Sequence, residues 1–381
     1  MRNWLLPENI EDILPPEAQR IEALRARLLE LYRVHGYLLV MPPLLEYLES
    51  LLTGTGEDLD LRTFKLVDQL SGRMMGIRAD ITPQVARIDA HLLNRSGVTR
   101  LCYCGSVVHT KLRSQIGTRE PLQIGAEIYG HAGIESDLEV QRLLLRSLSV
   151  CGVQEARLDM GHVAIFRSLC KRGGVSQAIE ADLYAALEAK DNPQLRILTK
   201  GLDVKTRDAL MQLPSLYGDR TMLRKAEKIL PAYPEIQGAL SDIDQLSRDP
   251  EFPVSIDLAD LRGYNYHSGI VFSVYVPGEP SAVALGGRYD EVGEAFGRAR
   301  PASGFSMDLR DIARIGSVPQ PQRAILAPCS EDTDLASAIE DLRTRKEVVI
   351  IDLSGNEQFF AELGCDRALA LMDGKWQVIT R

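Results

Sequence analysis

Asp80, Thr82, Gln123 and Glu127 have the types and spacing of a ligand-binding site. Asp80 and Thr82 stand where a helix is predicted to begin over residues 82–93, and Gln123 and Glu127 stand four positions apart on a predicted strand. Because side chains alternate along a strand, Gln123 and Glu127 share a face. A carboxylate pairs with an ammonium group, and a hydroxyl adds a neutral hydrogen bond. These residues therefore suit an amino-acid ligand, and histidine would need such groups for both ring nitrogens.

Other kinds of site lack their motifs in this chain. No phosphate loop of the Gly-x-x-x-x-Gly-Lys type is present, and Gly54-Thr55-Gly56 lacks both the third glycine and the preceding strand of a dinucleotide site. The six cysteines are scattered, and no second Cys or His pair at zinc-site spacing follows Cys102 and Cys104. We therefore expect no cofactor and no metal.

Length and charge restrict the class of protein further. The chain has 381 residues, too many for one simple core, so two or three domains are expected. Its net charge is −9, whereas a protein that grips an RNA backbone usually has a basic patch, so no tRNA partner is expected. No run of about eighteen apolar residues is long enough to cross a membrane. The N-terminus turns acidic at Glu8 and lacks an apolar signal core, which predicts a cytoplasmic location.

Hydrophobic periodicity predicts a mixed fold. One amphipathic helix is predicted over residues 17–35 and ends at Gly36, and another begins at Ser136, whose spacing to Glu139 matches a capping box. Short apolar segments with turn residues at their ends predict strands. They are residues 37–40, 64–70, 73–77, 101–108, 122–129, 156–160, 255–258, 270–276 and 282–285. Hairpins prevail over strand–helix–strand units, so the predicted class is α+β, with an antiparallel sheet flanked by helices.

Changes of composition divide the chain. Residues 176–248 are rich in Ala, Leu, Lys, Glu and Asp and are predicted to be a helical insertion. The main domain then comprises residues 1–175 and 249–316. Residues 317–321 have the composition of a linker, and residues 322–381 are predicted to be a small α/β domain near the lower size limit. The strands predicted in this domain are residues 324–327, 348–353, 368–372 and 376–380.

Several segments, in order, resemble the signatures of class II aminoacyl-tRNA synthetases. Asp12-Ile13-Leu14-Pro15-Pro16, with the helix after it, resembles the first signature, which usually builds a dimer interface. Gly304-Phe305-Ser306-Met307 resembles the last, where a strand leads into a helix. The resemblance spans residues 10–315. It implies a class II synthetase-like core and self-association through the first signature.

Three further segments resemble histidyl-tRNA synthetases in particular. Arg78-Ala79-Asp80-Ile81-Thr82 is similar to their Arg-Pro-Glu-Gly-Thr, Arg262-Gly263-Tyr264-Asn265-Tyr266 to their Arg-Gly-Leu-Asp-Tyr-Tyr, and Gly286-Gly287-Arg288-Tyr289-Asp290 to their Gly-Gly-Arg-Tyr-Asp. The resemblance implies that the histidine-binding residues are Asp80, Thr82, Gln123, Glu127, Arg262 and Tyr266. Each has an alternative structural role: Asp80 as a helix cap, Arg262 in a surface ion pair and Tyr266 in the core.

The chain departs from the synthetases where ATP would bind. The Phe-Arg-x-Glu of the second signature is matched here to Tyr103-Cys104-Gly105-Ser106, so that Cys104 replaces an arginine that binds phosphate. The arginine of the last signature is replaced by Asp311, and a carboxylate repels a triphosphate. Arg113 and Arg119 are loop residues and are not placed like a strand arginine. The resemblance therefore implies a synthetase paralogue with no catalytic residues.

Residues Arg78 to Arg87, in the pattern Arg-x-Asp-x-Thr-x-Gln-Val-Ala-Arg, look like the version of this segment in the regulatory subunits of ATP phosphoribosyltransferase. That resemblance implies a non-catalytic protein of histidine biosynthesis. Such a protein assembles with the short catalytic subunit and confers feedback inhibition by L-histidine. Two alternatives stay open: a divergent histidyl-tRNA synthetase, and a scaffold whose pocket is vestigial.

Overall fold

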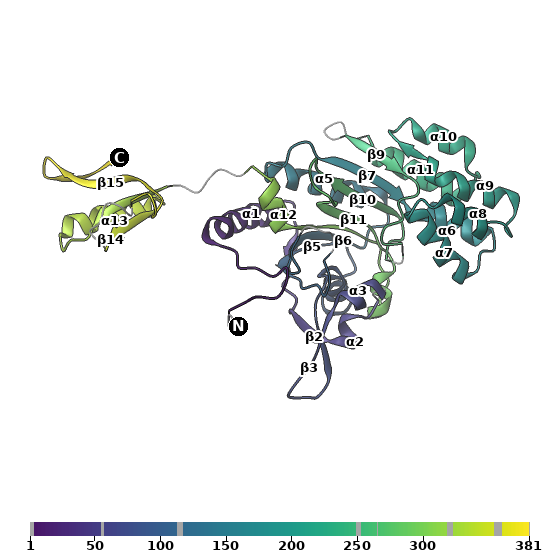
Figure 1. Cartoon of the computed structure of the whole chain (residues 1–381), viewed down its shortest axis with the longest axis horizontal. Helices are drawn as coiled ribbons and strands as arrows, with labels where there is room; N and C mark the ends of the chain where they lie inside the picture. The colour runs from purple at the N-terminus through teal and green to yellow at the C-terminus, as the bar shows by residue number, and fades with distance from the viewer. Residues whose placement is uncertain are drawn as a thin grey trace. The chain divides into compact units, whose positions relative to one another are not determined.

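The computed structural model describes residues 4–54, 57–112, 117–248, 253–264, 266–317, 323–353 and 360–380. The chain forms two compact units, Met1–Val318 and Pro319–Arg381. The first unit is built on a nine-stranded sheet with the order β1-β5-β6-β12-β11-β10-β7-β9-β8 (Figure 1). Its strands are β1 (Leu38–Leu39), β5 (Thr99–Ser106), β6 (Leu122–Tyr129), β7 (Arg157–His162), β8 (Tyr217–Gly218), β9 (Val254–Asp257), β10 (Ile270–Tyr275), β11 (Ala284–Arg288) and β12 (Ala302–Asp308).

Most neighbouring strands of this sheet are antiparallel. Every pairing from β5 through β6, β12, β11 and β10 to β7 is antiparallel, whereas β1 with β5 and β7 with β9 are parallel. The prediction of an α+β fold with a mainly antiparallel sheet is confirmed. Each strand predicted for the main domain overlaps an observed strand. The two-residue β8 was not predicted, because so short a segment has no periodicity to detect.

The two faces of the sheet bury different groups. On one face, Cys102 of β5 and Ile124 and Ala126 of β6 join the large hydrophobic core. The helices α1 (Pro15–Val34), α5 (Ile134–Val150) and α12 (Leu309–Ile315) contribute to the same core. The side chains that alternate with these, Tyr103 and Glu127, point to the opposite face, where they contact each other. The sheet therefore separates an apolar layer from a polar one.

Helix α1 has well-defined ends. Pro15 begins it, where the missing N–H of proline costs no helical hydrogen bond. Gly36 ends it with φ +84°, and the amides of Gly36 and Tyr37 donate to the carbonyls of Arg33 and Tyr32, as in a Schellman motif. The predicted helix over 17–35 with Gly36 as its stop is confirmed to within two residues.

Helix α5 begins earlier than predicted, and the capping box at Ser136 is wrong. The helix starts at Ile134, so Ser136 lies inside its first turn. The Ser136 hydroxyl donates to the Gly133 carbonyl at 2.8 Å, and the Glu139 carboxylate accepts from Arg100. Both side chains of the proposed box are thus occupied by tertiary contacts that sequence spacing does not reveal.

The helices of residues 163–246 gather at one end of the first unit (Figure 1). Residues 176–248 are largely helical, as predicted, but they also supply β8, which pairs with β9 and so extends the main sheet. The helices are α6 (Val163–Arg172), α7 (Gln177–Glu188), α8 (Asn192–Leu198), α9 (Val204–Gln212), the 3-10 turn η2 (Leu213–Ser215), α10 (Met222–Ile229) and α11 (Pro234–Leu246).

A smaller three-stranded sheet, ordered β2-β4-β3, carries the segment that leads into the candidate site. The predicted strand pair over 64–70 and 73–77 is confirmed, with the first strand ending at Val67 because Asp68 begins the turn and accepts the amides of Leu70 and Ser71. The elements around it are β2 (Leu45–Tyr47), α2 (Leu48–Leu51), α3 (Glu57–Arg62), β3 (Phe64–Val67), β4 (Met74–Ile77), α4 (Thr82–Arg87), the π-helix η1 (Ile88–Leu93) and the 3-10 helix η3 (Val292–Phe296).

The second unit is a four-stranded sheet ordered β14-β13-β15-β16. The four strands predicted for it are present, and α13 packs on one face through Leu335 and Ile339. Of the expected linker, residues 318–321 lie outside the described part of the chain. The elements are β13 (Ala324–Pro328), α13 (Thr333–Thr344), β14 (Val349–Asp352), β15 (Cys365–Met372) and β16 (Lys375–Thr380).

Candidate ligand-binding site

Two adjoining cavities open on the polar face of the nine-stranded sheet. We call the first the polar cavity, and its volume of about 130 Å³ is roughly ten times what one water molecule needs. Its lining residues include Asp80, Thr82, Glu127, Tyr266, His267, Gly304 and Tyr289. We call the second the acidic cavity, and its lining residues include His109, Gln123, Asp308 and Asp311. Leu285 and Ser306 line both.

Asp80 is held in place by its neighbours. Its Oδ1 atom accepts hydrogen bonds from Gln123 Nε2 at 2.8 Å and from the Thr82 amide at 3.0 Å. Gln123 Oε1 in turn accepts from the Ile81 amide at 2.9 Å. Asp80 therefore caps the helix through Oδ1 alone, and the hydrogen bond from Gln123 positions its carboxylate. Asp80 Oδ2 has no hydrogen-bond partner among the described residues, and Asp80 lines the polar cavity.

Glu127 lies at the base of the polar cavity. It is 1% exposed and accepts hydrogen bonds from the hydroxyls of Tyr103, at 3.0 Å, and Tyr289. Burial raises the pKa of the Glu127 carboxyl to about 8, so it is largely protonated at neutral pH. Gly304 makes room for it, since a Cβ at that position would lie 1.3 Å from Glu127 Oε2. The predicted placement of Gln123 and Glu127 on one strand face is confirmed.

Tyr266 contributes a buried hydroxyl without a partner. Its ring packs between Tyr289 and His267, with ring centroids 5.0 Å and 5.3 Å away. Its hydroxyl oxygen is buried and makes no hydrogen bond. The ring thus has the core role that was the structural alternative. Tyr266 lines the polar cavity, and its buried hydroxyl lacks the partner that buried polar groups normally have.

Arg262 does not reach either cavity. Its guanidinium pairs with the Asp260 carboxylate, with Nε at 2.8 Å from Oδ1, and donates to the Tyr275 hydroxyl. This is the ion-pair alternative, and it involves a partner only two residues away in the sequence. Arg262 is therefore not part of the described cavity lining.

His267 lines the polar cavity, and sequence reasoning missed it. Its Nδ1 lies 3.2 Å from the Arg288 carbonyl, and burial lowers the pKa of the imidazole to about 4, so the ring is neutral. One signal was available: the synthetase segment Arg-Gly-Leu-Asp-Tyr-Tyr ends in a second tyrosine, and this chain has His267 there. Tyr103 and Tyr289 were missed as well, although Tyr289 lies in a recognised segment.

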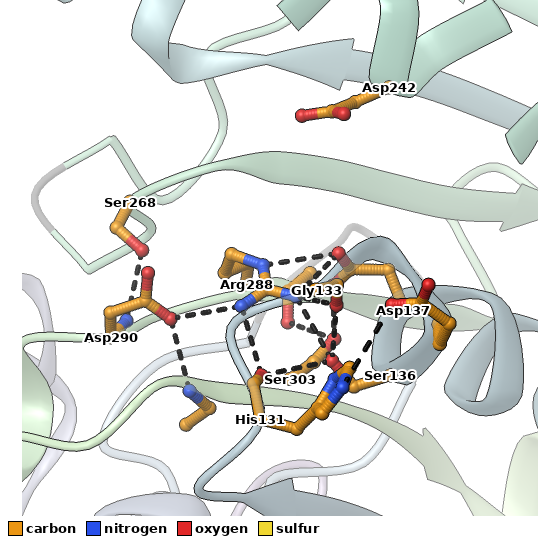
Figure 2. A network of polar contacts seen from close by, with 12 residues as sticks. His131, Gly133, Ser136, Asp137, Asp242, Ser268, Arg288, Asp290 and Ser303 are labelled. Atoms are coloured by element: carbon orange, nitrogen blue, oxygen red, sulfur yellow. Dashed lines mark hydrogen bonds and ion pairs between the residues drawn. The ribbon is translucent and has the colours of Figure 1, made fainter. Parts of the chain in front are cut away.

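Arg288 lies in a network of polar contacts (Figure 2), and its carbonyl contacts His267 Nδ1. Its guanidinium donates to Asp137 Oδ2 at 2.7 Å, to the Gly133 carbonyl at 2.8 Å and to the Ser136 hydroxyl at 3.0 Å. Because a buried ion pair with several hydrogen bonds has one well-defined geometry, this network fixes the backbone whose carbonyl orients His267.

The acidic cavity has no means of gripping a triphosphate among its described lining residues. None of them is Lys or Arg, and Asp308 and Asp311 are both carboxylates. Burial raises the pKa of Asp308 to about 7. Asp311, the predicted replacement of a phosphate-binding arginine, does lie at this cavity, 3.3 Å from Arg314.

Cys104 is not at this cavity, so its assignment as the replaced phosphate-binding arginine is wrong. It alternates with Tyr103 on β5 and packs against the large apolar core on the other face of the sheet. Among the residues that follow this strand, Val107 and His109 line the acidic cavity. Arg119 donates to the His109 carbonyl at 3.0 Å, and Arg113 lies outside the described residues.

No group of three His, Cys, Asp or Glu among the described residues is placed to hold a metal ion. No helix among them is long and apolar enough to span a bilayer.

Comparisons with known proteins identify the relatives of the chain. The family model described as "Histidyl-tRNA synthetase" matches residues 9–312, and the model described as "ATP phosphoribosyltransferase subunit HisZ C-terminal domain" matches residues 322–379. Over 380 residues the chain is 58% identical to the ATP phosphoribosyltransferase regulatory subunit of Ralstonia pickettii (strain 12J), covering 100% of this chain and 98% of that protein. The chain belongs to the family of ATP phosphoribosyltransferase regulatory subunits.

Other members and solved structures agree with this family. The regulatory subunit of Burkholderia cenocepacia (strain J2315) is 57% identical over 382 residues, with 100% of both chains covered. A crystal structure from Bacillus halodurans, named an ATP phosphoribosyltransferase regulatory subunit/histidyl-tRNA synthetase, has a TM-score of 0.82 at 26% identity and covers 95% of this chain and 96% of its own. The histidyl-tRNA synthetase of Nostoc sp. PCC 7120, at 17% identity and a TM-score of 0.79, shares the fold.

Proposed function

We propose that this chain is the non-catalytic regulatory subunit of an ATP phosphoribosyltransferase, assembles with the catalytic subunit and binds L-histidine as a feedback effector. The observation that carries the proposal is the contrast between the two cavities. The polar cavity keeps Asp80, Thr82 and Glu127, whereas the described lining of the acidic cavity has two carboxylates and no cation. Among the described lining residues, groups suited to an amino acid are present in the polar cavity, and Lys and Arg are absent from the acidic cavity.

The groups of the polar cavity match those of histidine. Asp80 Oδ2 is placed to pair with the ligand ammonium, and Gln123 holds that carboxylate in position. The cluster of Glu127 with Tyr103 and Tyr289 provides a buried hydrogen-bonding wall for a polar ring. A buried charge-assisted pair contributes more than a neutral one, so Asp80 should dominate the affinity.

Adenylation is not expected from the acidic cavity. Adenylation develops negative charge on the α-phosphate, and preorganised hydrogen-bond donors must stabilise it. The loss of one such donor typically lowers the rate by about 10²–10³. Asp311 adds repulsion at the position of a lost donor. This argues against the alternative of a divergent histidyl-tRNA synthetase.

Feedback inhibition follows from linkage if histidine binds the less active arrangement of the complex more tightly. A ligand shifts an equilibrium only by its differential affinity for the two states. The regulatory role therefore requires that histidine affinity of the complex change when the substrates of the catalytic subunit are bound.

Calorimetric titration of the purified chain with L-histidine and with ATP tests the pocket. We expect saturable histidine binding, weakening by roughly 10-fold or more in Asp80→Ala because a charge-assisted pair is lost. Asp182→Ala, an exposed carboxylate on α7, is the matched control and should bind as the wild type does. Tight ATP binding, or an affinity unchanged in Asp80→Ala, would contradict the proposal.

Co-purification with the catalytic subunit, assayed with and without histidine, tests the regulatory role. The complex should be active and inhibited by histidine, and Asp80→Ala should make it resistant. If the chain activates the catalytic subunit and Asp80→Ala leaves inhibition intact, the scaffold with a vestigial pocket is the correct alternative.

We also propose self-association through the first class II signature. An exposed apolar set supports it: Leu38, Leu39, Met41, Leu44 and Leu45. Sedimentation should show a dimer that Met41→Glu weakens and the control Val204→Glu, on an exposed apolar position of α9, does not. A wild-type monomer at micromolar concentration would overturn this assignment.

A further inference from the structure

One wall of the polar cavity belongs to an irregular segment of the chain. Tyr266 and His267 line the cavity, and they lie between β9 and β10 in a segment whose described residues form no helix or strand. We call residues 262–264 and 266–267 the wall segment. Gly263 has φ +68°, and its carbonyl accepts the amides of Tyr266 and His267, each at 2.8 Å. Irregular segments open locally unless tertiary contacts hold them, so the cavity wall depends on those contacts.

Helices α6 and α7 hold the wall segment through Tyr264. This residue is buried, stacks on Tyr184 with ring centroids 5.6 Å apart, and meets the ring of Phe166 edge-on at 5.2 Å. Its hydroxyl donates to the Glu180 carboxylate. Burial raises the pKa of the Tyr264 hydroxyl well above its usual value, so the hydroxyl stays a donor. Glu180 and Tyr184 belong to α7 and Phe166 to α6, so two helices enclose one side chain of the wall segment.

Arg167 of α6 joins two points of the wall segment. Its Nη2 atom donates to the carbonyls of Tyr264 and His267, each at 3.2 Å, and its guanidinium lies over the Tyr264 ring, 5.0 Å from the centroid. Hydrogen bonds from a charged donor are stronger than neutral ones, so this side chain restrains the backbone of both residues. Tyr264 itself is not among the described residues that line the polar cavity, and it acts on the cavity through its neighbours in the chain.

The contact with α7 is a departure of this chain from the synthetase segment. Tyr264 stands where Arg-Gly-Leu-Asp-Tyr-Tyr has a leucine, and a leucine has no hydroxyl to donate to Glu180. The acceptor comes from the beginning of the helical insertion, residues 176–248. The hydrogen bond therefore joins the insertion to the cavity wall through a residue that the synthetase pattern does not supply.

We propose that Tyr264 and Arg167 are positioning residues that make the ligand affinity of the polar cavity depend on α7. The inference rests on the proposed binding of histidine and adds the helical insertion as a place from which that affinity is set. If the contacts of Tyr264 are lost, the wall segment spends less time in its binding-competent position, and the apparent affinity falls with that fraction. Because linkage is reciprocal, bound histidine must in turn stabilise α7.

Calorimetric titration of full-length variants with L-histidine measures the effect on affinity. Tyr264→Phe removes the hydroxyl and keeps the ring, and Glu180→Ala removes its acceptor. Each should weaken histidine binding by about three- to tenfold, as for one hydrogen bond. The double variant should bind no more weakly than the weaker single variant, because both changes remove the same bond. Arg167→Met should weaken binding at least as much, whereas Glu180→Gln keeps an acceptor oxygen and should stay within about twofold of wild type.

Hydrogen exchange measures the position of the wall segment and its link to α7. In the ligand-free protein, the amides of Tyr266 and His267 should exchange about three- to tenfold faster in Tyr264→Phe than in wild type, since less holds their segment closed. Saturating histidine should slow exchange of the α7 amides around Tyr184 in wild type and have a smaller effect in Tyr264→Phe. A residue that only stabilised the fold would leave this response to histidine unchanged.

A matched control and thermal melts keep the outcomes distinct. Glu235→Ala removes an exposed ion pair with Arg172 of α6 and should bind histidine as wild type does. The melts establish that each variant is folded. If wild type binds histidine but Tyr264→Phe, Glu180→Ala and Arg167→Met all bind it within about twofold of wild type, or if saturating histidine leaves α7 exchange unchanged, this inference is wrong and the proposed function stands.

The ligand-free exchange decides the inference even where the proposed function fails. If wild type binds no histidine, the proposed function is wrong. Faster exchange of the Tyr266 and His267 amides in Tyr264→Phe would then still support the positioning role, and unchanged exchange would refute it.

Discussion

The polar cavity and the acidic cavity share part of a wall but differ in how their groups are held. In the polar cavity, Asp80 and Glu127 are each fixed by two hydrogen bonds from neighbours. In the acidic cavity, two carboxylates lie together without a cation among the described lining residues. Preorganised groups retain a binding function, whereas like charges brought together do not grip an anion. This difference is what the proposed function requires, an ordered polar pocket beside a cavity without Lys or Arg among its described lining residues.

The largest expected effect concerns the support behind the polar cavity. Asp137→Ala removes the nearer carboxylate partner of buried Arg288 and leaves Asp290, at 3.4 Å, as the other, and removing one partner of a buried pair costs about 3–5 kcal/mol. We expect a large loss in the free energy of unfolding, measured by denaturant titration, and weaker histidine binding in the fraction that folds. Asp89→Ala breaks the other buried pair, with Arg300, and should destabilise similarly without changing histidine affinity. Equal losses of affinity in both would contradict a specific role of the Arg288 network in supporting the polar cavity.

A second test fills the polar cavity from its floor. Gly304→Ala places a methyl group 1.3 Å from Glu127 Oε2, and overpacking a buried site typically costs about 1–3 kcal/mol. We expect a lower melting temperature and loss of histidine binding. Gly238→Ala in α11 has nothing within 4 Å of its new methyl and should stabilise the protein by up to about 1 kcal/mol. An unchanged affinity in Gly304→Ala would show that Glu127 is not at the ligand.

A third test uses pH. The folded-state pKa of Glu127, about 8, lies above its ordinary value of 4.5, so the unfolded chain loses this proton first and stability falls as pH rises between them. The pKa of His267, about 4, has the opposite effect below 6.5, where the unfolded chain gains a proton that the folded chain refuses. Between pH 6.5 and 8 the fall in stability with pH comes from Glu127 and from Asp308, whose pKa is raised to about 7.

Denaturant titrations between pH 6.5 and 8 measure this slope. The free energy of unfolding should fall with pH in the wild type and fall less steeply in Glu127→Gln. Glu331→Gln, at an exposed position of the second unit, should keep the wild-type slope. A slope unaltered in Glu127→Gln would mean that the buried carboxyl is already ionised at neutral pH.

The smallest expected effect is in the acidic cavity. Asp311→Asn removes one charge from a half-exposed side chain that does not line the polar cavity. Because screened charges contribute little, histidine affinity should stay within about twofold. Calorimetry with ATP should still show no tight binding, since neutralising a carboxylate supplies no donor cation. Strong ATP binding by this variant would mean that Asp311 alone blocks a site that is otherwise intact.

Much of the polar cavity was predictable from the sequence. Strand alternation placed Gln123 and Glu127 on one face, and the ordered segments placed Asp80 and Thr82 beside them. Arg262 was not correctly placed, because Asp260, two residues earlier, competes for its guanidinium, and local ion pairs leave no trace in a motif. Cys104 was misassigned because a motif match shifted along a strand changes the face on which each side chain lies.

The fold was predictable where a hydrophobic periodicity extended over many residues. The prediction failed where tertiary contacts determine the end of an element. The range of α1 followed from its apolar spacing and Gly36. The start of α5 did not, because Ser136 serves the Arg288 network and not a capping box. His267 was visible only as a departure from a quoted segment, and its position at the polar cavity depends on the tertiary structure.

The two outer strands of the nine-stranded sheet are each two residues long, β1 at Leu38–Leu39 and β8 at Tyr217–Gly218. Exposed sheet edges are templates on which other chains add strands and aggregate. Edges this short offer almost no backbone for such growth. The short strand that the helical segment adds beside β9 thus also helps to keep a large sheet from polymerising.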